Sequence, residues 1–168
     1  MRQPLPVVRQ LYWPGLIPQF LAIAALSAVA WFVLPISNFI QAGVVGAVIY
    51  LISCRLLRLQ FTRDHILGMK AYRAGEFRDA ITHFEASHQF FSVHRRLDAW
   101  RSLLLGVASY NPYRVIALGN MAWCYGQLGE GPKAVELFEH VLQEVPDHAG
   151  ARAGLNMLRA SVPQTGAA

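Results

Sequence analysis

The sequence predicts an all-α protein in which a transmembrane helical hairpin is followed by a stack of helix–turn–helix units, about five or six helices in all. Three observations predict it. A long apolar stretch near the N-terminus carries no charge, two later segments resemble each other as helical hairpins, and apolar residues recur at helical spacing between those two segments.

Composition and charge point to a membrane rather than to nucleic acid. The chain is 54% hydrophobic and 15% charged, well below the quarter of charged residues usual in soluble domains. Residues 1–60 carry four arginines and no acid, whereas residues 61–168 carry 11 basic and 10 acidic residues, a net of +1. The positive charge therefore lies beside the apolar stretch, and the remainder lacks the basic stripe of a nucleic-acid-binding domain.

The apolar stretch is long enough for two membrane crossings. Residues 10–54 form a run of 45 residues without a charged side chain, and one crossing takes about 20 residues. Pro35, Ser37 and Asn38 are turn formers in the middle of the run. The predicted transmembrane helices are residues 15–34 and 39–57.

The arginines predict the orientation of the hairpin. Arg2 and Arg9 precede it, and Arg55, Arg58 and Arg63 follow it, whereas the central turn is uncharged. The positive-inside rule then places both termini in the cytoplasm, with residues 1–14 as a cytoplasmic segment. Arg55 and Arg58 are expected to reach the lipid headgroups. The compact anchor is compatible with a bacterial inner membrane.

Small residues four apart mark the expected packing faces of the two spans. The candidates are Ala24 with Ala28, Ala42 with Gly46, and Gly43 with Ala47. Two interpretations stay open, because these faces either pack the two helices on each other or dock them against another membrane protein. The middle of each span contains no ionisable residue, which argues against a transport path.

A cleaved signal peptide is the alternative to a hairpin. Ala28-Val29-Ala30 has the small-x-small pattern of a cleavage site after a basic start and an apolar run. Cleavage would leave one span. The apolar run continues without a break through residues 31–34, unlike the polar start that usually follows cleavage, so two spans are the favoured prediction.

The chain repeats itself at an offset of 54 residues. The matching positions are Gly75 and Gly129, Glu76 and Glu130, Ala80 and Ala134, Phe84 and Phe138, and Glu85 and Glu139. Each copy has the pattern of two short helices around a glycine turn. Alanine permits close approach of the helices, and phenylalanine fills the space between successive hairpins.

This pattern resembles the tetratricopeptide repeat, a helix–turn–helix unit of 34 residues. The second copy, residues 115–148, has Leu118, Met121, Ala122, Tyr125, Gly129, Ala134, Phe138, Val141 and Pro146 at the family's positions. The first copy, residues 61–94, has Leu67, Gly68, Gly75, Ala80 and Phe84 but departs at Ala71 and Ser92, where the family has an aromatic residue and a proline. Two repeats are fewer than a stable stack usually needs, so additional helices, a partner or a second copy of the chain must complete it.

Additional helices are expected beside the two repeats, in a helical domain of residues 61–160. Residues 95–110 are predicted to form one inserted helix, and residues 147–160 a last helix that caps the stack. A stripe at helical spacing in the insertion is expected to pack between the two hairpins; it consists of Leu97, Trp100, Leu103, Leu104 and Val107. Residues 161–168 are predicted to be disordered.

The chain shows no motif for catalysis, a cofactor or a metal. Its histidines lack the spacing of a helical zinc pair, and its two cysteines, Cys54 and Cys124, are far apart and read as isolated thiols. The glycines at 126, 129 and 131 lie in a helix–helix turn rather than after a strand, so they do not form a phosphate loop. We therefore expect neither an enzyme nor a nucleic-acid-binding protein.

The resemblance implies binding of protein segments on the face lined by the first helix of each repeat. The residues implied there are His65, Met69, Tyr72 and Arg73 from the first copy and Asn120, Trp123 and Gln127 from the second. Trp123 either lies in this groove or packs under the inserted helix. Of the residues with which some members hold a C-terminal carboxylate, only Asn120 is present, so binding to chaperone C-termini is not predicted.

Two functional hypotheses follow. In the first, the protein is an adaptor or scaffold, anchored in the lipid bilayer, that binds protein partners at the cytoplasmic face. In the second, it is a small accessory or assembly subunit of a membrane complex that makes its main contact through the transmembrane helices. Both hypotheses are compatible with a protein that forms a homo-oligomer.

Overall fold

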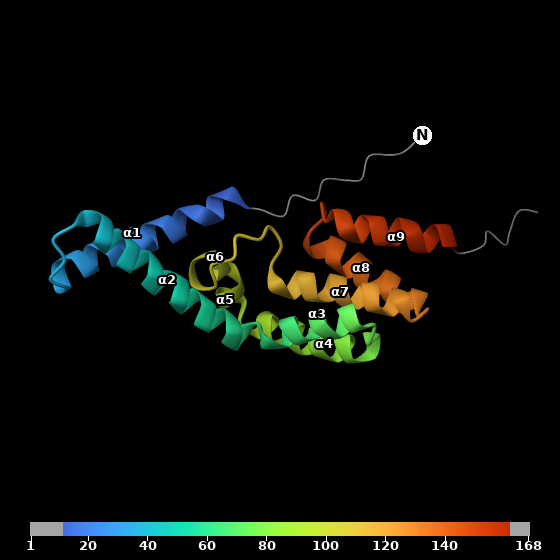
Figure 1. Cartoon of the computed structure of the whole chain (residues 1–168). Helices are drawn as coiled ribbons and strands as arrows, with labels where there is room; N and C mark the ends of the chain where they lie inside the picture. The colour runs from blue at the N-terminus through green and yellow to red at the C-terminus, as the bar shows by residue number, and fades with distance from the viewer. Residues whose placement is uncertain (1–11, 162–168) are drawn as a thin grey trace, which may run out of the picture. The chain divides into compact units, whose positions relative to one another are not determined.

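The computed structural model describes residues 12–161, and every regular element in that range is a helix (Figure 1). The prediction of an all-α protein is therefore confirmed for this range. Arg2, Arg9 and residues 162–168 of the predicted tail lie outside the described residues, whereas Ser161, predicted to begin that tail, is the last residue of a helix. The chain folds as two compact units. We call residues 12–63 and 94–110 the anchor unit, and residues 64–93 and 111–161 the stack unit.

Two long apolar helices form the body of the anchor unit. A short 3-10 helix, η1 (Trp13–Leu16), leads into α1 (Ile17–Val33), and α2 (Phe39–Phe61) runs four residues beyond its predicted end. The side-chain oxygen of Asn38 accepts a hydrogen bond of 2.9 Å from the backbone of Ile40 and so caps the start of α2. The continuous segment of η1 and α1, Trp13–Val33, and helix α2 are each long and apolar enough to cross a membrane, with mean hydropathies of 2.0 and 1.8.

The two helices pack on each other along one of the predicted small-residue pairs. Ala42 and Gly46 of α2 are buried, and a Cβ at Gly46 would lie 2.7 Å from the Cα of Ser27 on α1. Ala24 and Ala28 are exposed and do not take part in this contact. Gly43 and Ala47 are half-buried. The α1–α2 contact therefore uses the Ala42 and Gly46 face.

The insertion between the two repeats differs from its prediction. Residues 95–110 contain two short helices, α5 (Arg95–Ala99) and α6 (Arg101–Leu104), instead of one continuous helix. They belong to the anchor unit, where α6 contacts η1, α1 and α2 (Figure 1). Gly106 ends the helical stretch with a φ of +62°, a left-handed conformation that glycine adopts without strain.

The expectation that the apolar stripe of the insertion packs between the two hairpins is therefore wrong. Trp100 is 58% exposed and Leu104 is 36% exposed, and the apolar residue of this segment that is buried is Leu105. The cause is tertiary. The hydroxyl of Tyr50 donates a 3.0 Å hydrogen bond to the carbonyl of Leu103, which holds α6 against α2.

Five helices form the stack unit. They are α3 (Arg63–Ala74), α4 (Phe77–Val93), α7 (Tyr113–Gln127), α8 (Gly131–Glu144) and α9 (Ala149–Ser161). The turn from α3 to α4 and the turn from α7 to α8 have the same hydrogen bonds. Gly75 and Gly129, with φ of +81° and +75°, each donate to the carbonyl three residues back, and the next residue donates to the carbonyl five residues back. Both turns are thus the same glycine-ended helix cap.

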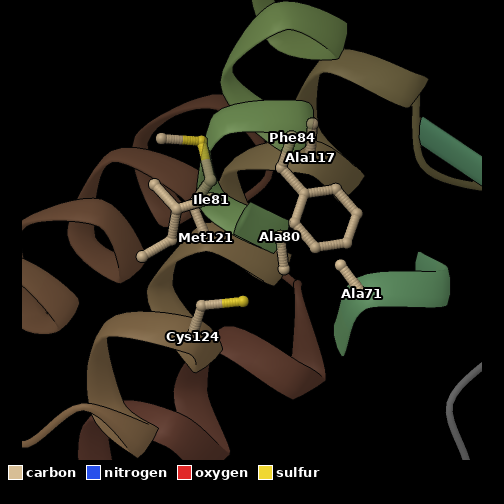
Figure 2. Close-up of a cluster of buried hydrophobic side chains, with 7 residues drawn as sticks. All are labelled: Ala71, Ala80, Ile81, Phe84, Ala117, Met121 and Cys124. Carbon is tan, nitrogen blue, oxygen red and sulfur yellow. The ribbon is translucent and has the colours of Figure 1, made fainter. Parts of the chain in front are cut away.

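Two hydrophobic clusters meet on α7. The first joins α3, α4 and α7, and Figure 2 shows its seven side chains gathered between these ribbons: Ala71, Ala80, Ile81, Phe84, Ala117, Met121 and Cys124. The second joins α7, α8 and α9 through Val115, Leu118, Ala122, Phe138, Val141, Ala151 and Leu155. Ala80 and Ala134 are fully buried, and so are Phe84 and Phe138 to within 1%. Tyr125 is half-buried against the first cluster, and Pro146 is exposed after α8.

The glycine-ended turns give a first testable prediction. Gly129→Ala should lower the free energy of unfolding by about 1–2 kcal/mol, because the left-handed φ of +75° strains a residue with a Cβ. The matched control is Gly126→Ala. It lies on α7 with no atom within 4 Å of the new Cβ, and should stabilise by up to about 1 kcal/mol. Denaturant unfolding in mild detergent, followed by circular dichroism, measures both, and equal shifts would contradict the assignment of the turn.

A second pair of variants tests the packing of the hairpin. Gly46→Ala should cost about 1–3 kcal/mol, because its Cβ overlaps Ser27 and α1 must move away from α2. Gly43→Ala is the control, since nothing lies within 4 Å of its Cβ. The midpoint of thermal unfolding in detergent should fall for the first variant and stay near wild type for the second. The contact would be disproved by unchanged midpoints in both.

Candidate functional site

A hollow of about 490 Å³ lies on the outer face of α3 in the stack unit. Its lining residues are His65, Ile66, Met69, Lys70 and Arg73. Residues three and four apart share one face of a helix, so Ile66, Met69, Lys70 and Arg73 follow one another along the same stripe. The result is an apolar floor with two cationic side chains at its side.

His65 forms the inner end of the hollow and is held by aromatic rings. Its ring lies edge-on to Phe84 at 5.6 Å and to Tyr113 at 5.1 Å between centroids. Its Nδ1 is 3.5 Å from the hydroxyl of the buried Ser87. Burial lowers the pKa of His65 from 6.5 to about 4. The imidazole is therefore neutral at pH 7, and the positive charge of the hollow comes from Lys70 and Arg73.

One residue of α7 contacts Met69, a lining residue of the hollow. The side-chain amide of Asn120 lies 3.5 Å from the sulfur of Met69, across the space between α7 and α3. Asn120 lies on the part of α7 that neither hydrophobic cluster uses. Because Met69 is unbranched and flexible, the floor of the hollow can adapt its shape to what it contacts.

The other residues predicted for the groove lie away from the hollow. Tyr72 packs its ring against Phe77 at 5.7 Å. The indole of Trp123 lies edge-on to Phe138 at 5.2 Å, so it packs on the second cluster of the stack unit. Gln127 is exposed at the end of α7. Of the seven predicted residues, His65, Met69 and Arg73 thus line the hollow, and Asn120 contacts Met69.

Two lining residues were missed from the sequence. Ile66, which is 47% exposed, and Lys70 follow from the same helical spacing as Met69 and Arg73. The resemblance directed attention to the family's positions, whereas the i, i+3, i+4 stripe along residues 66, 69, 70 and 73 would have identified them. The signal in the sequence was an isoleucine on the same helical stripe as a lysine and an arginine.

Metal ligands and thiols are the remaining reactive groups of the described residues. Within residues 12–161, no three His, Cys, Asp or Glu side chains come together to hold a metal ion. Cys124 is buried on α7, and burial raises the pKa of its thiol to about 11. It stays protonated and packs as an apolar side chain in the first cluster.

Comparisons with known proteins give no relative for this chain. Neither a family model nor a curated protein nor a solved structure matches this chain. The candidate site therefore rests on the contacts and charges of its own residues.

The buried histidine predicts a specific loss of stability in acid. Between pH 6.5 and 4 the unfolded His65 binds a proton and the folded one does not, so stability falls as pH falls. The full difference amounts to about 3 kcal/mol. His65→Gln should make the unfolding free energy flatter across this range in denaturant titrations at pH 7.5, 6 and 5. His83→Gln, at a half-exposed site, should keep the wild-type slope, and an unchanged slope in His65→Gln would refute the burial effect.

Proposed function

We propose that this protein is a membrane-anchored adaptor whose tetratricopeptide-like stack unit binds a segment of another protein. In this proposal α1 and α2 cross the membrane, and both termini are cytoplasmic. The exposure of the two helices supports the crossing, since only 6% and 22% of their most apolar windows are buried. A core helix of a soluble protein would be covered by its own fold.

The stack unit supports the tetratricopeptide-like part of the proposal. Its two hairpins share the same glycine cap, the same buried alanine and the same buried phenylalanine at an offset of 54 residues. Helix α9 follows α8 and packs on the second cluster, as a capping helix would. These are the features by which such repeats stack on one another.

The hollow on α3 is the observation that carries the binding proposal. An exposed isoleucine and a flexible methionine give apolar contact, while Lys70 and Arg73 give positive charge. A fitting segment places an apolar side chain on the floor and a carboxylate beside the cations. The side-chain amide of Asn120 lies 3.5 Å from the sulfur of Met69, near enough to help position the backbone of the bound segment.

A second candidate function rests on the outer face of α1. Ala24 and Ala28 are exposed there, away from the α1–α2 contact. Small residues four apart permit close approach of another transmembrane helix. In this case the protein is an accessory subunit of a membrane complex, and its main contact lies in the bilayer.

Site-specific photo-crosslinking distinguishes the two candidates. A photoreactive residue is placed at Ile66 in the hollow, at Ala28 on α1, or at the exposed Met157 of α9 as the control, in the full-length protein in its native membranes. The adaptor proposal expects a discrete crosslinked protein from position 66 that is absent from position 157 and is lost in Lys70→Glu/Arg73→Glu. A specific product from position 28 alone supports the accessory subunit and argues against the hollow.

A further inference from the structure

The insertion between the repeats belongs to the anchor, and this placement has a consequence for the membrane. Its residues 102–108 pack beside Tyr50 and Cys54, in the half of α2 that carries Arg55 and Arg58. The carbonyl of Leu103 accepts from the hydroxyl of Tyr50 at 3.0 Å and lies 3.5 Å from the sulfur of Cys54, the residue before Arg55. The backbone of Tyr12, at the start of the hairpin, donates to the carbonyl of Ala108 at 2.9 Å.

Several polar groups of the irregular backbone of the insertion are hydrogen-bonded within the protein. Arg101 donates to the carbonyl oxygens of Asp98 at 2.7 Å, Ser109 at 2.7 Å and Tyr110 at 3.1 Å. The amide of Leu105 donates back to the carbonyl of Arg101 at 2.9 Å. Non-helical backbone is tolerated at membrane depth only when it is paired in this way. The arrangement suits a segment that lies against lipid.

The charge of the described anchor unit is almost entirely positive. It holds six arginines and one acid, Asp98, a net of +5, and Asp98 is 0% exposed. The described stack unit holds seven basic and nine acidic residues, a net of −2. The fold thus adds Arg95, Arg96 and Arg101 to the arginines already beside the spans. No carboxylate is exposed on the described surface of the anchor unit to oppose them.

Exposed aromatic and apolar side chains accompany these charges. Trp100 is 58% exposed, Trp13 63%, and Tyr110 46%, and Leu104 lies one turn after Trp100. Tryptophan and tyrosine favour the membrane–water interface because their rings are apolar and their polar atoms stay hydrated. A hollow of about 180 Å³ beside them is lined by Tyr12, Ala99, Arg101, Ser102, Ser109 and Tyr110. Its hydroxyl groups suit a lipid headgroup, whereas its guanidinium, that of Arg101, is hydrogen-bonded within the protein.

Arg95 and Arg96 are the cations of the insertion that remain available. Both are exposed at the start of α5, and among residues 12–161 no hydrogen bond or ion pair engages their guanidinium groups. Arg101, in contrast, is committed to backbone carbonyls. The two guanidinium groups therefore have no anionic partner within the described residues. A negatively charged lipid headgroup is a partner of matching charge.

We propose that residues 94–110 form a membrane-interface element in which Arg95 and Arg96 bind the headgroups of anionic phospholipid, while Trp100 and Leu104 enter the boundary with the acyl chains. The inference rests on the crossing of the membrane by α1 and α2 in the proposed function. It does not depend on the hollow of the stack unit. Each guanidinium near an anionic surface strengthens lipid binding about fivefold.

The test uses the full-length protein in nanodiscs of phosphatidylcholine with about one-third phosphatidylglycerol, a composition chosen to expose the preference for negative headgroups. After extraction in mild detergent, native mass spectrometry measures the ratio of the two lipids retained by the protein. Wild type should be enriched in phosphatidylglycerol. Arg95→Gln/Arg96→Gln should lose most of this enrichment, whereas Arg152→Gln/Arg159→Gln, which removes two exposed arginines of the stack unit, should keep it.

A second measurement reports the position of Trp100. Brominated phosphatidylcholine should quench the fluorescence of wild type more strongly than that of Trp100→Phe. Equal lipid ratios for wild type and Arg95→Gln/Arg96→Gln, or equal quenching for wild type and Trp100→Phe, would overturn the interface element. Alkaline extraction of wild-type membranes separates the two failures, because release of the protein would overturn the crossing itself.

Discussion

The need of α7 to bury two faces at once is the constraint on which the stack unit depends. Val115, Leu118 and Ala122 face α8 and α9, while Ala117, Met121 and Cys124 face α3 and α4. A helix buried on two sides has room for few polar side chains. Its one charged side chain, Arg114, pairs with Glu144 of α8 at 2.8 Å. Both sides of α7 are occupied, and its remaining face carries Asn120, whose side-chain amide contacts Met69 of α3.

A corresponding constraint holds the insertion in the anchor unit. Chain that is neither helix nor strand needs partners for its backbone, and Arg101 and Tyr50 supply them. The guanidinium of Arg101 thus holds the backbone of the insertion, whereas Arg95 and Arg96 remain exposed. The separation of arginines into structural and available ones is what gives the anchor a candidate surface for anionic lipid. The stack unit, with its net of −2, has no comparable excess of positive charge.

Much of the local structure was predictable because it depends on neighbours in the chain. The glycine turns at 75 and 129, the break at Asn38 and the buried Phe84 and Phe138 follow from spacing and residue type. The candidate site was only partly predictable. Met69 and Arg73 were expected in it, but Trp123 was drawn to Phe138, because the gain from burying an indole ring depends on which neighbours the fold provides.

The sequence by itself determined the helices, the two apolar helices of membrane-spanning length and the internal repeat, because hydrophobic period, turn residues and charge act over short distances along the chain. Only the tertiary structure decided where the insertion belongs. Its stripe of Leu97, Trp100 and Leu104 has the spacing of a core helix, yet that spacing does not say which surface will cover it. Hydrogen bonds from Tyr50, about 50 residues earlier, and from Tyr12 decide this, and such pairings leave no periodic signal in the sequence.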